Sequence, residues 1–230
     1  MFNHVEHNIV LPKLTRETTE SGRKYFTPEG YAYPSVTTVL GNLSKKSIAQ
    51  WRKRVGEEEA NKISHRASTR GTAIHQMCED YLNNKEGYLE GAMPNNVETF
   101  NVLKPHLDSN ISNVWFQEEF LYSTELECAG QVDCIAEYEG ELSIIDFKTS
   151  LKWKKEEWVQ NYFMQTAFYA AAFYERTGVP IKQGVVIIAV DNEPVPQVFK
   201  VDTFKYLPDF IDARHRYRLE MEIGNTLLYK

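Results

Sequence analysis

The spacing of apolar residues changes about halfway along the chain. In the first half they recur at intervals of three or four, as Ile48, Trp51 and Val55 do after Ser44. This spacing is typical of an amphipathic helix, and Ser44 is a suitable N-cap for it. Two more helices are expected around residues 67–83 and 96–108. Before them, residues 9–33 have the pattern of short strands, with turns at residues 20–22 and 28–30.

The second half has mainly the pattern of strands. Residues 114–122, 129–138 and 141–148 are three consecutive segments rich in β-branched and aromatic side chains. A long helix is then expected over residues 155–176, ended by Gly178 and Pro180. It is followed by a buried strand (184–190), an edge strand (197–201) and an amphipathic C-terminal helix (206–222). The order of helix, three strands, helix and strand predicts an α/β domain with a mixed sheet.

The length of 230 residues suits one domain with one sizeable core. Within it we distinguish N-terminal strands and turns (1–43), a helical wall (44–110), the sheet with its long helix (112–202) and a C-terminal helix (203–230). The chain is 42% hydrophobic and 25% charged, as in an ordinary soluble domain, and no apolar run reaches transmembrane length.

One predicted turn places two aspartates opposite each other. If residues 139–140 form a two-residue hairpin turn, the register that follows pairs Asp133 with Asp146. Because strand side chains alternate, Lys148 emerges on the same face. Like charges in direct opposition destabilise a sheet, so we expect this pair to hold a cation. The alternative is two solvated carboxylates, but residues 142–145, which precede Asp146, have the composition of a buried strand.

A helix in the first half carries a second group of candidate residues. Gly71, His75 and Glu79 are four residues apart and therefore share one helix face. Glycine weakens a helix, which suggests that something approaches the backbone at Gly71 closely. His75 is suited to be a third metal ligand, with Glu79 as its partner. An isolated pair of this kind would more often be a surface His–Glu contact.

Two further polar positions interrupt apolar segments. Glu118 and Glu119 follow an apolar and aromatic strand segment, and alternation directs one of them toward the site and the other toward solvent. Sequence does not distinguish the two. Gln165 lies in a helical stripe of aromatic residues whose other members are expected in the core: Trp158, Tyr162 and Tyr169. Its amide needs a partner, which is either a core backbone group or the substrate.

The charge is unevenly distributed although the net value is −6. Basic residues gather between residues 44 and 70 and again at residues 152–155, with Trp51 and Trp153 among them. Each cluster by itself is more often a solvated surface. Their position on either side of the proposed site favours an interface for a single nucleic-acid strand, because such strands are held by stacking and by Lys and Arg contacts.

The three cysteines have no ligand-like spacing. Cys78, Cys128 and Cys134 are odd in number and are expected as reduced thiols in the core. The N-terminus has neither a signal-peptide core nor the Arg-rich, acid-poor composition of a transit peptide. We therefore expect a cytoplasmic protein of a bacterium or of a phage-infected host, with no membrane partner.

Four ordered motifs resemble those of the RecB-type nucleases in the PD-(D/E)XK superfamily. The matching residues are Arg70 and Gly71 with His75 and Glu79, then residues 130–133, then residues 146–150, then Gln165 with Tyr169. Within the superfamily the likeness is greatest to the mitochondrial genome maintenance exonucleases and their phage and bacterial relatives. It extends from residue 34 to residue 190, and four motifs in order are far more specific than Asp-x-Lys alone.

The resemblance implies a nuclease core and a role for each motif. His75, Asp133, Asp146 and the backbone carbonyl of Phe147 would bind Mg²⁺ or Mn²⁺, and Lys148 would orient or activate the attacking water. Glu118 or Glu119, with Glu79, would supply auxiliary acidic groups. Together with the basic clusters, the motifs lead us to expect DNA contacts from nine residues: Trp51, Arg70, Thr149, Ser150, Lys152, Lys154, Lys155, Gln165 and Tyr169.

The chain departs from the family pattern in two ways. Its third motif is Asp-x-Lys, whereas Glu-x-Lys is commoner, and it lacks the four cysteines that hold an iron–sulfur cluster in some relatives, so we expect no cluster. The function that the resemblance implies is a metal-dependent DNA exonuclease for single-stranded ends in phage or bacterial replication, recombination or repair, with proteins of those processes as possible partners. The alternatives are a flap endonuclease with the same site and a non-catalytic DNA-binding subunit of a recombination complex.

Overall fold

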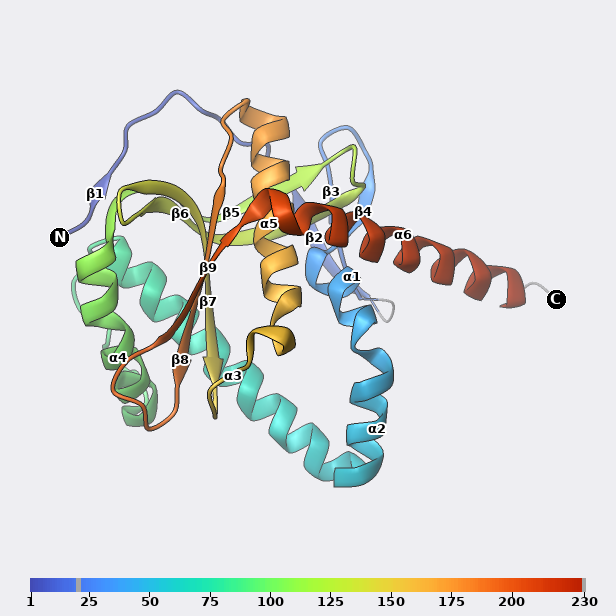
Figure 1. The fold of residues 1–230 in the computed structure, drawn as a ribbon, viewed down its shortest axis with the longest axis horizontal. Helices are drawn as coiled ribbons and strands as arrows, with labels where there is room; N and C mark the ends of the chain where they lie inside the picture. The colour runs from blue at the N-terminus through green and yellow to red at the C-terminus, as the bar shows by residue number, and fades with distance from the viewer. Residues whose placement is uncertain (20–21, 229–230) are drawn as a thin grey trace.

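A computed structural model describes residues 1–19 and 22–228, with side chains up to residue 223. A mixed sheet forms its centre, and helices lie against both faces (Figure 1). The order of strands in this sheet is β1-β5-β6-β7-β8-β9, and β2, β3 and β4 form a small separate sheet. The fold is therefore the predicted α/β domain with a mixed sheet.

The N-terminal segment builds the small sheet. Its antiparallel strands are β2 (Thr15–Thr19), β3 (Gly22–Phe26) and β4 (Ala32–Pro34), and the short β1 (Asn3–His4) instead joins the large sheet parallel to β5. The predicted turn at residues 28–30 is confirmed by Gly30, whose φ is 89° and whose amide donates to the Thr27 carbonyl. Glu20 and Ser21 of the other predicted turn lie outside the described residues.

Four helices follow. They are α1 (Val36–Leu43), α2 (Lys45–Val55), α3 (Glu57–Leu82) and α4 (Pro94–Asn110). The hydroxyl of Ser35 caps α1 by accepting from the Thr38 amide at 3.0 Å. Ser44 is the N-cap residue of α2, as predicted, but its side chain makes no capping hydrogen bond. Helix α3 begins ten residues earlier than expected, directly after Gly56.

Three long antiparallel strands form the middle of the large sheet. They are β5 (Ile111–Ser123), β6 (Cys128–Tyr138) and β7 (Glu141–Ser150). Glu139 and Gly140 have φ values of 52° and 81°, as a type I′ turn requires, and Tyr138 pairs with Glu141. The predicted turn and register of the hairpin are confirmed.

The remaining elements complete the sheet and cover it. Strand β8 (Gln183–Val190) is parallel to β7, and the edge strand β9 (Gln197–Asp202) is antiparallel to β8. Between β7 and β8 the chain forms a 3₁₀ turn (Glu156–Trp158) and α5 (Gln160–Thr177), which ends at Gly178 with φ 73°. The last helix is α6 (Thr203–Leu228). Trp158 is 60% exposed, so its prediction as a core residue is wrong.

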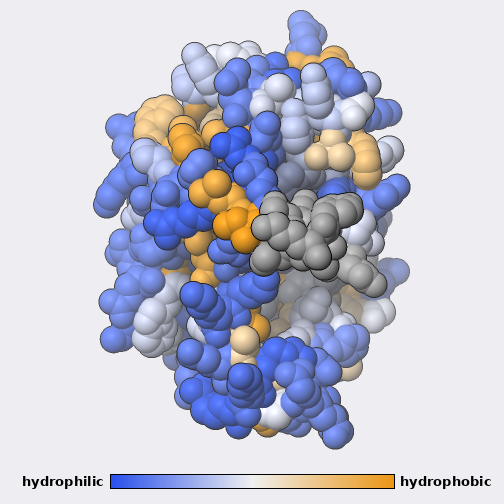
Figure 2. Space-filling view, turned by 90° about the vertical axis from the view of Figure 1, so that its right-hand side faces the viewer, coloured by the Kyte–Doolittle hydropathy of each residue, from blue (hydrophilic) through white to orange (hydrophobic). Residues whose placement is uncertain are grey.

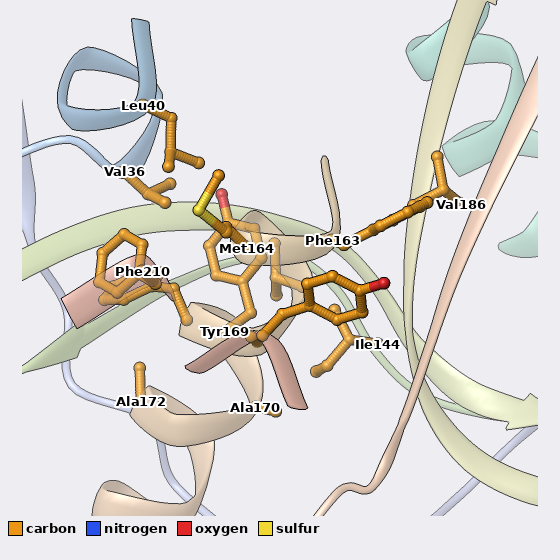
Figure 3. Close-up of a cluster of buried hydrophobic side chains, with 14 of the residues drawn as sticks. Val36, Leu40, Ile144, Phe163, Met164, Tyr169, Ala170, Ala172, Val186 and Phe210 are labelled. Atoms are coloured by element: carbon orange, nitrogen blue, oxygen red, sulfur yellow. The ribbon is translucent and has the colours of Figure 1, made fainter. Parts of the chain in front are cut away.

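Two hydrophobic layers enclose the large sheet. On one face α1, α5 and α6 contribute Val36, Phe163 and Phe210 to a cluster that also contains Ile144 and Tyr169 (Figure 3). On the other face α3 and α4 contribute side chains such as Ile74 and Phe100. Because both faces are covered, a polar side chain on β6 or β7 must be either paired or part of a site.

Two parts of the molecule extend from this body. Helix α2 and the beginning of α3 project together below the sheet, and α6 runs out to the right (Figure 1). Helix α2 has no buried side chain, and residues 61–69 of α3 are all exposed. Seen from the end of α6, the surface is mostly hydrophilic, with apolar side chains in several separate places (Figure 2). No helix among the described residues is long and apolar enough to cross a membrane.

Candidate active site

The sheet divides at Asp133. The β6–β7 ladder ends at the pair Cys134–Ile145, after which β6 continues along β5 and β7 continues along β8. The register places Asp133 opposite Asp146 at this division. Asp133 Oδ2 accepts a 2.8 Å hydrogen bond from the Phe147 amide, in place of a backbone ladder bond. The predicted opposition of the two aspartates is therefore present, and it opens the sheet.

Asp146 is held by two side chains. Gln165 Nε2 donates to Asp146 Oδ1 at 3.1 Å, and Lys148 Nζ lies 2.5 Å from Asp146 Oδ2. This contact is an ion pair, and Oδ2 accepts no hydrogen bond from any described residue. Asp146 is only 1% exposed.

Residues from two other elements approach Asp133. His75 of α3 places Nδ1 3.4 Å from Asp133 Oδ2. Glu118 of β5 lies opposite Asp133, since Gln117 pairs with Cys134 and Glu119 with Val132. One ligand atom from each of His75, Glu118 and Asp133 lies within 4.8 Å of the others.

Glu118 adopts a backbone conformation that is unusual for its residue type. Its φ is 51°, in the left-handed region, and its carbonyl accepts a 2.9 Å hydrogen bond from Gln131 Nε2. Such conformations cost free energy and are often found at functional sites. Glu118 is half-buried in the site while Glu119 is exposed, which resolves the choice between them. Glu79 lies on the same α3 face as His75, and its carboxylate accepts from Gln76.

Burial and mutual repulsion shift the pKa values of these groups. Burial raises the pKa of Glu118 to about 7, and Asp133 adds to the shift. Burial likewise raises the pKa of Asp146 to about 6, although Lys148 opposes it. Burial lowers the pKa of His75, but the nearby Asp133 carboxylate outweighs it and the net shift is upward.

Asp133 and Lys148 remain charged. Burial favours neutral Asp133, but His75, Lys148 and the Phe147 amide together lower the pKa of its carboxyl. Burial also opposes the charge of Lys148, and Asp146 with Asp133 outweighs it, so the pKa of the lysine is raised.

A ring of contacts behind the site fixes β6. Tyr169 donates to the Gln131 carbonyl at 2.7 Å, and its hydroxyl and ring crowd Gly130. A Cβ at Gly130 would lie 2.8 Å from the Tyr169 ring and 2.9 Å from Val36. Glycine is thus required here by close packing. At Gly71, where we expected a close approach, no described atom lies within 4 Å of such a Cβ, so the protein itself supplies no reason for that glycine.

The site opens into a polar cleft of about 570 Å³. His75, Glu79, Glu118, Asp133, Lys148, Gln165 and Tyr169 are among its lining residues, as the sequence predicted. It is also lined by Arg16 and Arg23 from the small sheet, which the sequence analysis missed. Their strands are distant in sequence from every motif, so no spacing pattern could have indicated them.

Several predicted DNA-contacting residues lie elsewhere. Arg70 makes an ion pair with Asp191 and donates to Thr99, and it lines a separate cavity. Ser150 donates to the Lys152 carbonyl at 2.6 Å, which shapes the end of β7. The others lie outside the cleft lining, half-buried or exposed: Trp51, Thr149, Lys152, Lys154 and Lys155. Whether DNA reaches them remains a prediction.

The donor set suits a hard divalent cation. One imidazole and two carboxylates converge at His75, Glu118 and Asp133, and the buried Asp146 Oδ2 has no conventional hydrogen bond. This differs from the predicted set, because Glu118 joins the cluster and Asp146 is instead bound by Lys148 and Gln165. The Phe147 carbonyl remains a predicted ligand. Cys78 and Cys134 are buried, and burial raises the pKa of both thiols, so neither is a ready thiolate ligand.

The fold and the site together define an α/β domain of the nuclease type. The chain belongs to the PD-(D/E)XK nuclease superfamily, whose sequence profile matches residues 103–222, just over half of the chain. The matched region contains β5, β6, β7 and α5, and with them Glu118, Asp133, Asp146, Lys148, Gln165 and Tyr169, whereas the cleft residues His75, Glu79, Arg16 and Arg23 lie before it.

Curated relatives share this family likeness. The chain is 27% identical over 187 residues to the human mitochondrial genome maintenance exonuclease 1, which covers 70% of this chain and 50% of the relative. It is 26% identical over 194 residues to the Xenopus tropicalis protein of that name, covering 74% and 52%. The chain thus spans about half the length of the curated relatives it matches.

A solved structure of an alkaline exonuclease from Laribacter hongkongensis also resembles the chain. It is 12% identical, covers 68% of this chain and 85% of that one, and has a TM-score of 0.25. The family assignment comes from the sequence profile alone.

Proposed function

We propose that this protein is a metal-dependent DNA exonuclease that acts on single-stranded ends. The observation that carries the proposal is the division of the sheet at Asp133, where His75 and Glu118 converge on Asp133 in a polar cleft that Lys148, the ion-pair partner of the buried Asp146, also lines. Family membership and the exonuclease names of the relatives support the reaction class. The preference for single strands is what the family resemblance implies, and the projecting helices α2 and α3 support it.

The residues supply what phosphodiester hydrolysis needs. A phosphodiester is anionic, so the site must add positive charge and deliver a nucleophile near neutral pH. His75, Glu118 and Asp133, with Asp146 behind them, would hold Mg²⁺ or Mn²⁺. When bound, such an ion polarises a phosphoryl oxygen and lowers the pKa of bound water.

Lys148 would add a fixed positive charge at the reacting phosphate. Its raised pKa keeps the ammonium protonated, so it would stabilise the charge that develops on phosphoryl oxygens and orient the attacking water. Asp146 holds Nζ at 2.5 Å, and the Tyr162 ring, 5.2 Å from Nζ, stabilises the cation from another side. Gln165 and Tyr169 would act by positioning Asp146 and β6.

The projecting helices support the preference for strand ends. We call α2 and the first half of α3 the projecting arm. Some of its basic residues are paired, as Arg52 is with Glu57 and Lys62 with Glu58. Others have no carboxylate partner among the described residues: Lys53, Arg54 and Arg66. Unpaired cations attract a nucleic-acid backbone. A strand guided by the arm would enter the cleft by a free end.

Two alternatives share parts of this picture. A flap endonuclease would use the same site on a branched substrate. A non-catalytic DNA-binding subunit would need no catalytic charges, and the intact set of Asp133, Asp146 and Lys148 argues against it. For the setting we propose phage or bacterial DNA replication, recombination or repair, in the cytoplasm.

The test is metal-dependent degradation of an end-labelled single strand. Wild type should degrade it with Mg²⁺ or Mn²⁺ and stop when EDTA is added. Asp146→Asn and Lys148→Ala should each lose cleavage by at least about a hundredfold, because each removes charge that acts on the transition state. Glu119→Gln, an exposed neighbour of Glu118, is the matched control and should retain activity. Undiminished cleavage by Asp146→Asn would remove the basis of the proposal.

A further inference from the structure

The cleft has a cationic wall opposite its acidic one. Arg16 of β2 and Arg23 of β3 both line it, together with the acidic residues Glu79, Glu118 and Asp133. In the β2–β3 register Arg16 pairs with Tyr25 and Thr18 pairs with Arg23. Cross-strand partners and residues two apart share a face, so both guanidinium groups project from the same face of the hairpin.

The hairpin is firmly attached to the large sheet. Tyr25 is 1% exposed and packs edge-on against Phe120 with ring centroids 5.5 Å apart. Leu14 and Tyr33 complete this small core with Tyr122 of β5. The two arginines therefore project into the cleft from a rigid support.

Arg16 is also positioned individually. Its Nη1 donates to Gln131 Oε1 at 2.9 Å, and its guanidinium lies 5.8 Å from the centre of the Phe120 ring. Gln131 is two residues before Asp133 on β6, so this contact lies about 7 Å along the strand from the metal-site carboxylate. Among the described residues this bond uses one of the five N–H donors of Arg16.

Neither arginine has an ion-pair partner in the part of the chain that the structure describes. Among the described residues no carboxylate lies within salt-bridge distance of Arg16 or Arg23, although most other arginines of the chain are paired. Two guanidinium groups without a described ion pair face a cluster of carboxylates suited to a metal, so the cleft is positive at one side and negative at the other. The acidic side needs a cation and the basic side needs an anion, and the fork of arginine matches phosphate geometry.

We propose that Arg16 and Arg23 form a phosphate subsite that holds a phosphate neighbouring the scissile one. This rests on the proposed function, and it identifies the β2–β3 hairpin as the part of the protein that positions the strand along the cleft. The bound group is a phosphate oxyanion, supplied either by an internal phosphodiester or by the phosphomonoester at a strand end.

The experiment measures binding separately from cleavage. A 12-nucleotide single strand with an internal fluorophore is titrated with full-length protein in EDTA, at several salt concentrations, and its anisotropy is followed. Each phosphate neutralised on a single strand contributes about 0.7 to the slope of log affinity against log salt. Arg16→Gln and Arg23→Gln should each flatten the slope by about that amount.

Lys24→Gln is the matched control. Lys24 directly follows Arg23 on β3 and pairs with Glu17, so it lies on the opposite face of the hairpin. It removes the same charge from the same element, so the slope should not change. Equal slopes for wild type and the double variant Arg16→Gln/Arg23→Gln would overturn the inference, as would equal flattening by Lys24→Gln.

Modified strands identify the source of the phosphate. One series replaces single internal phosphates with neutral methylphosphonates, and another carries or lacks a terminal phosphate. At the contacted position, neutralisation should weaken binding by wild type several-fold and leave the double variant unaffected. Equal losses for both proteins at every position would overturn the subsite. A wild-type enzyme that does not cleave with Mg²⁺ would instead refute the proposed function, whatever the binding data show.

Discussion

Asp146 shows, at the scale of one residue, how the candidate site lowers the stability of the folded protein. A carboxylate that is 1% exposed loses its hydration, and only one ammonium and one amide replace it. Burial therefore raises its pKa to about 6, while burial and Asp133 raise that of Glu118 to about 7. Folding of the metal-free protein is thus opposed by the groups that we expect to carry the chemistry.

The direction of these shifts predicts a pH dependence. Both folded pKa values exceed the ordinary 4.5 for Glu118 and 3.8 for Asp146, so the folded state binds more protons than the unfolded state between about pH 4 and 7. Protonation of these two carboxyls therefore stabilises the folded state. The stabilisation is fully present at about pH 4 and is lost as pH rises through 7. In EDTA the melting temperature should fall from pH 5.5 to pH 8, and saturating Mn²⁺ should raise it more at pH 8, because metal binding displaces protons.

Glu118→Gln provides the control for this effect. The amide has no titration near neutrality, so the fall in melting temperature between pH 6 and 8 should be smaller than in wild type. Glu119→Gln removes a neighbouring charge from the solvent side and should leave the profile unchanged. A wild-type melting temperature that rises across this range would contradict the assigned direction of the shifts.

At the scale of elements, two glycines with opposite surroundings allow a direct comparison. Gly130→Ala places a methyl group 2.8 Å from Tyr169 and 2.9 Å from Val36, which should cost about 1–3 kcal/mol and disturb β6 beside Asp133. Gly71→Ala meets no described atom within 4 Å and should stabilise α3 by about 0.5–1 kcal/mol. Urea unfolding at constant pH measures both changes.

Gly71→Ala also separates stability from binding. If a DNA strand approaches this backbone, the alanine should raise stability and weaken DNA affinity in the same protein. Gains in stability with unchanged affinity would mean that the glycine has no role in binding.

An ion pair joins α3, which carries His75, to the turn after β8 that contacts the end of β7. Arg70 precedes His75 by five residues on α3, and its partner Asp191 directly follows β8. The backbone amide of Asp191 donates to the carbonyl of Ser150, the last residue of β7. Asp191→Ala should therefore loosen α3 against β7, lower stability by about 1–2 kcal/mol and raise the Mg²⁺ concentration for half-maximal cleavage. The double variant Arg70→Asp/Asp191→Arg should recover part of both losses. No recovery would show that Arg70 acts through another contact, such as the DNA that its motif suggested.

Local chemistry explains which elements were predictable. The hairpin register followed from one turn and from alternation, and both act over neighbouring residues. The start of α3 was not predicted, because residues 57–66 have little apolar periodicity. In the structure they form one continuous helix with the segment predicted from Ala67 onward. Trp158 was placed in the core by helical spacing, but the chain forms a 3₁₀ turn there and the ring is exposed.

Site residues that belong to sequence motifs were predictable. Site residues contributed by segments distant in sequence were not. His75, Asp133 and Lys148 follow from residue type and spacing. The choice of Glu118 over Glu119 depends on a left-handed backbone at one position, which alternation does not reveal. Arg16 and Arg23 come from a hairpin whose place beside β6 is fixed by tertiary packing of Tyr25 and Phe120.

At the scale of the whole molecule, the projecting arm predicts how substrates are selected. Helix α2 and the first half of α3 extend from the body with almost no buried side chains, and they carry unpaired basic residues (Figure 1). If a strand must pass beside this arm to reach the cleft, a covalently closed single-stranded circle should survive a digestion that destroys the linear strand. Agarose gels of both forms test this.

Linearising the same circle at one site is the control, because it changes only the presence of ends. The linearised strand should be degraded at the rate of other linear strands. Efficient cutting of the closed circle would favour the endonuclease alternative.

The tight turn at Glu139 and Gly140 also has a consequence for the order of folding. It joins Asp133 and Asp146 through a local hairpin, and short loops close faster and at lower entropic cost than long ones. His75 must instead approach across α4 and β5. The two aspartates should therefore meet before the histidine arrives, and pulsed hydrogen exchange during refolding should protect amides of β6 and β7 before those of α3. Repulsion between the aspartates would then slow the assembly of the hairpin, and a divalent cation in the refolding buffer should accelerate it.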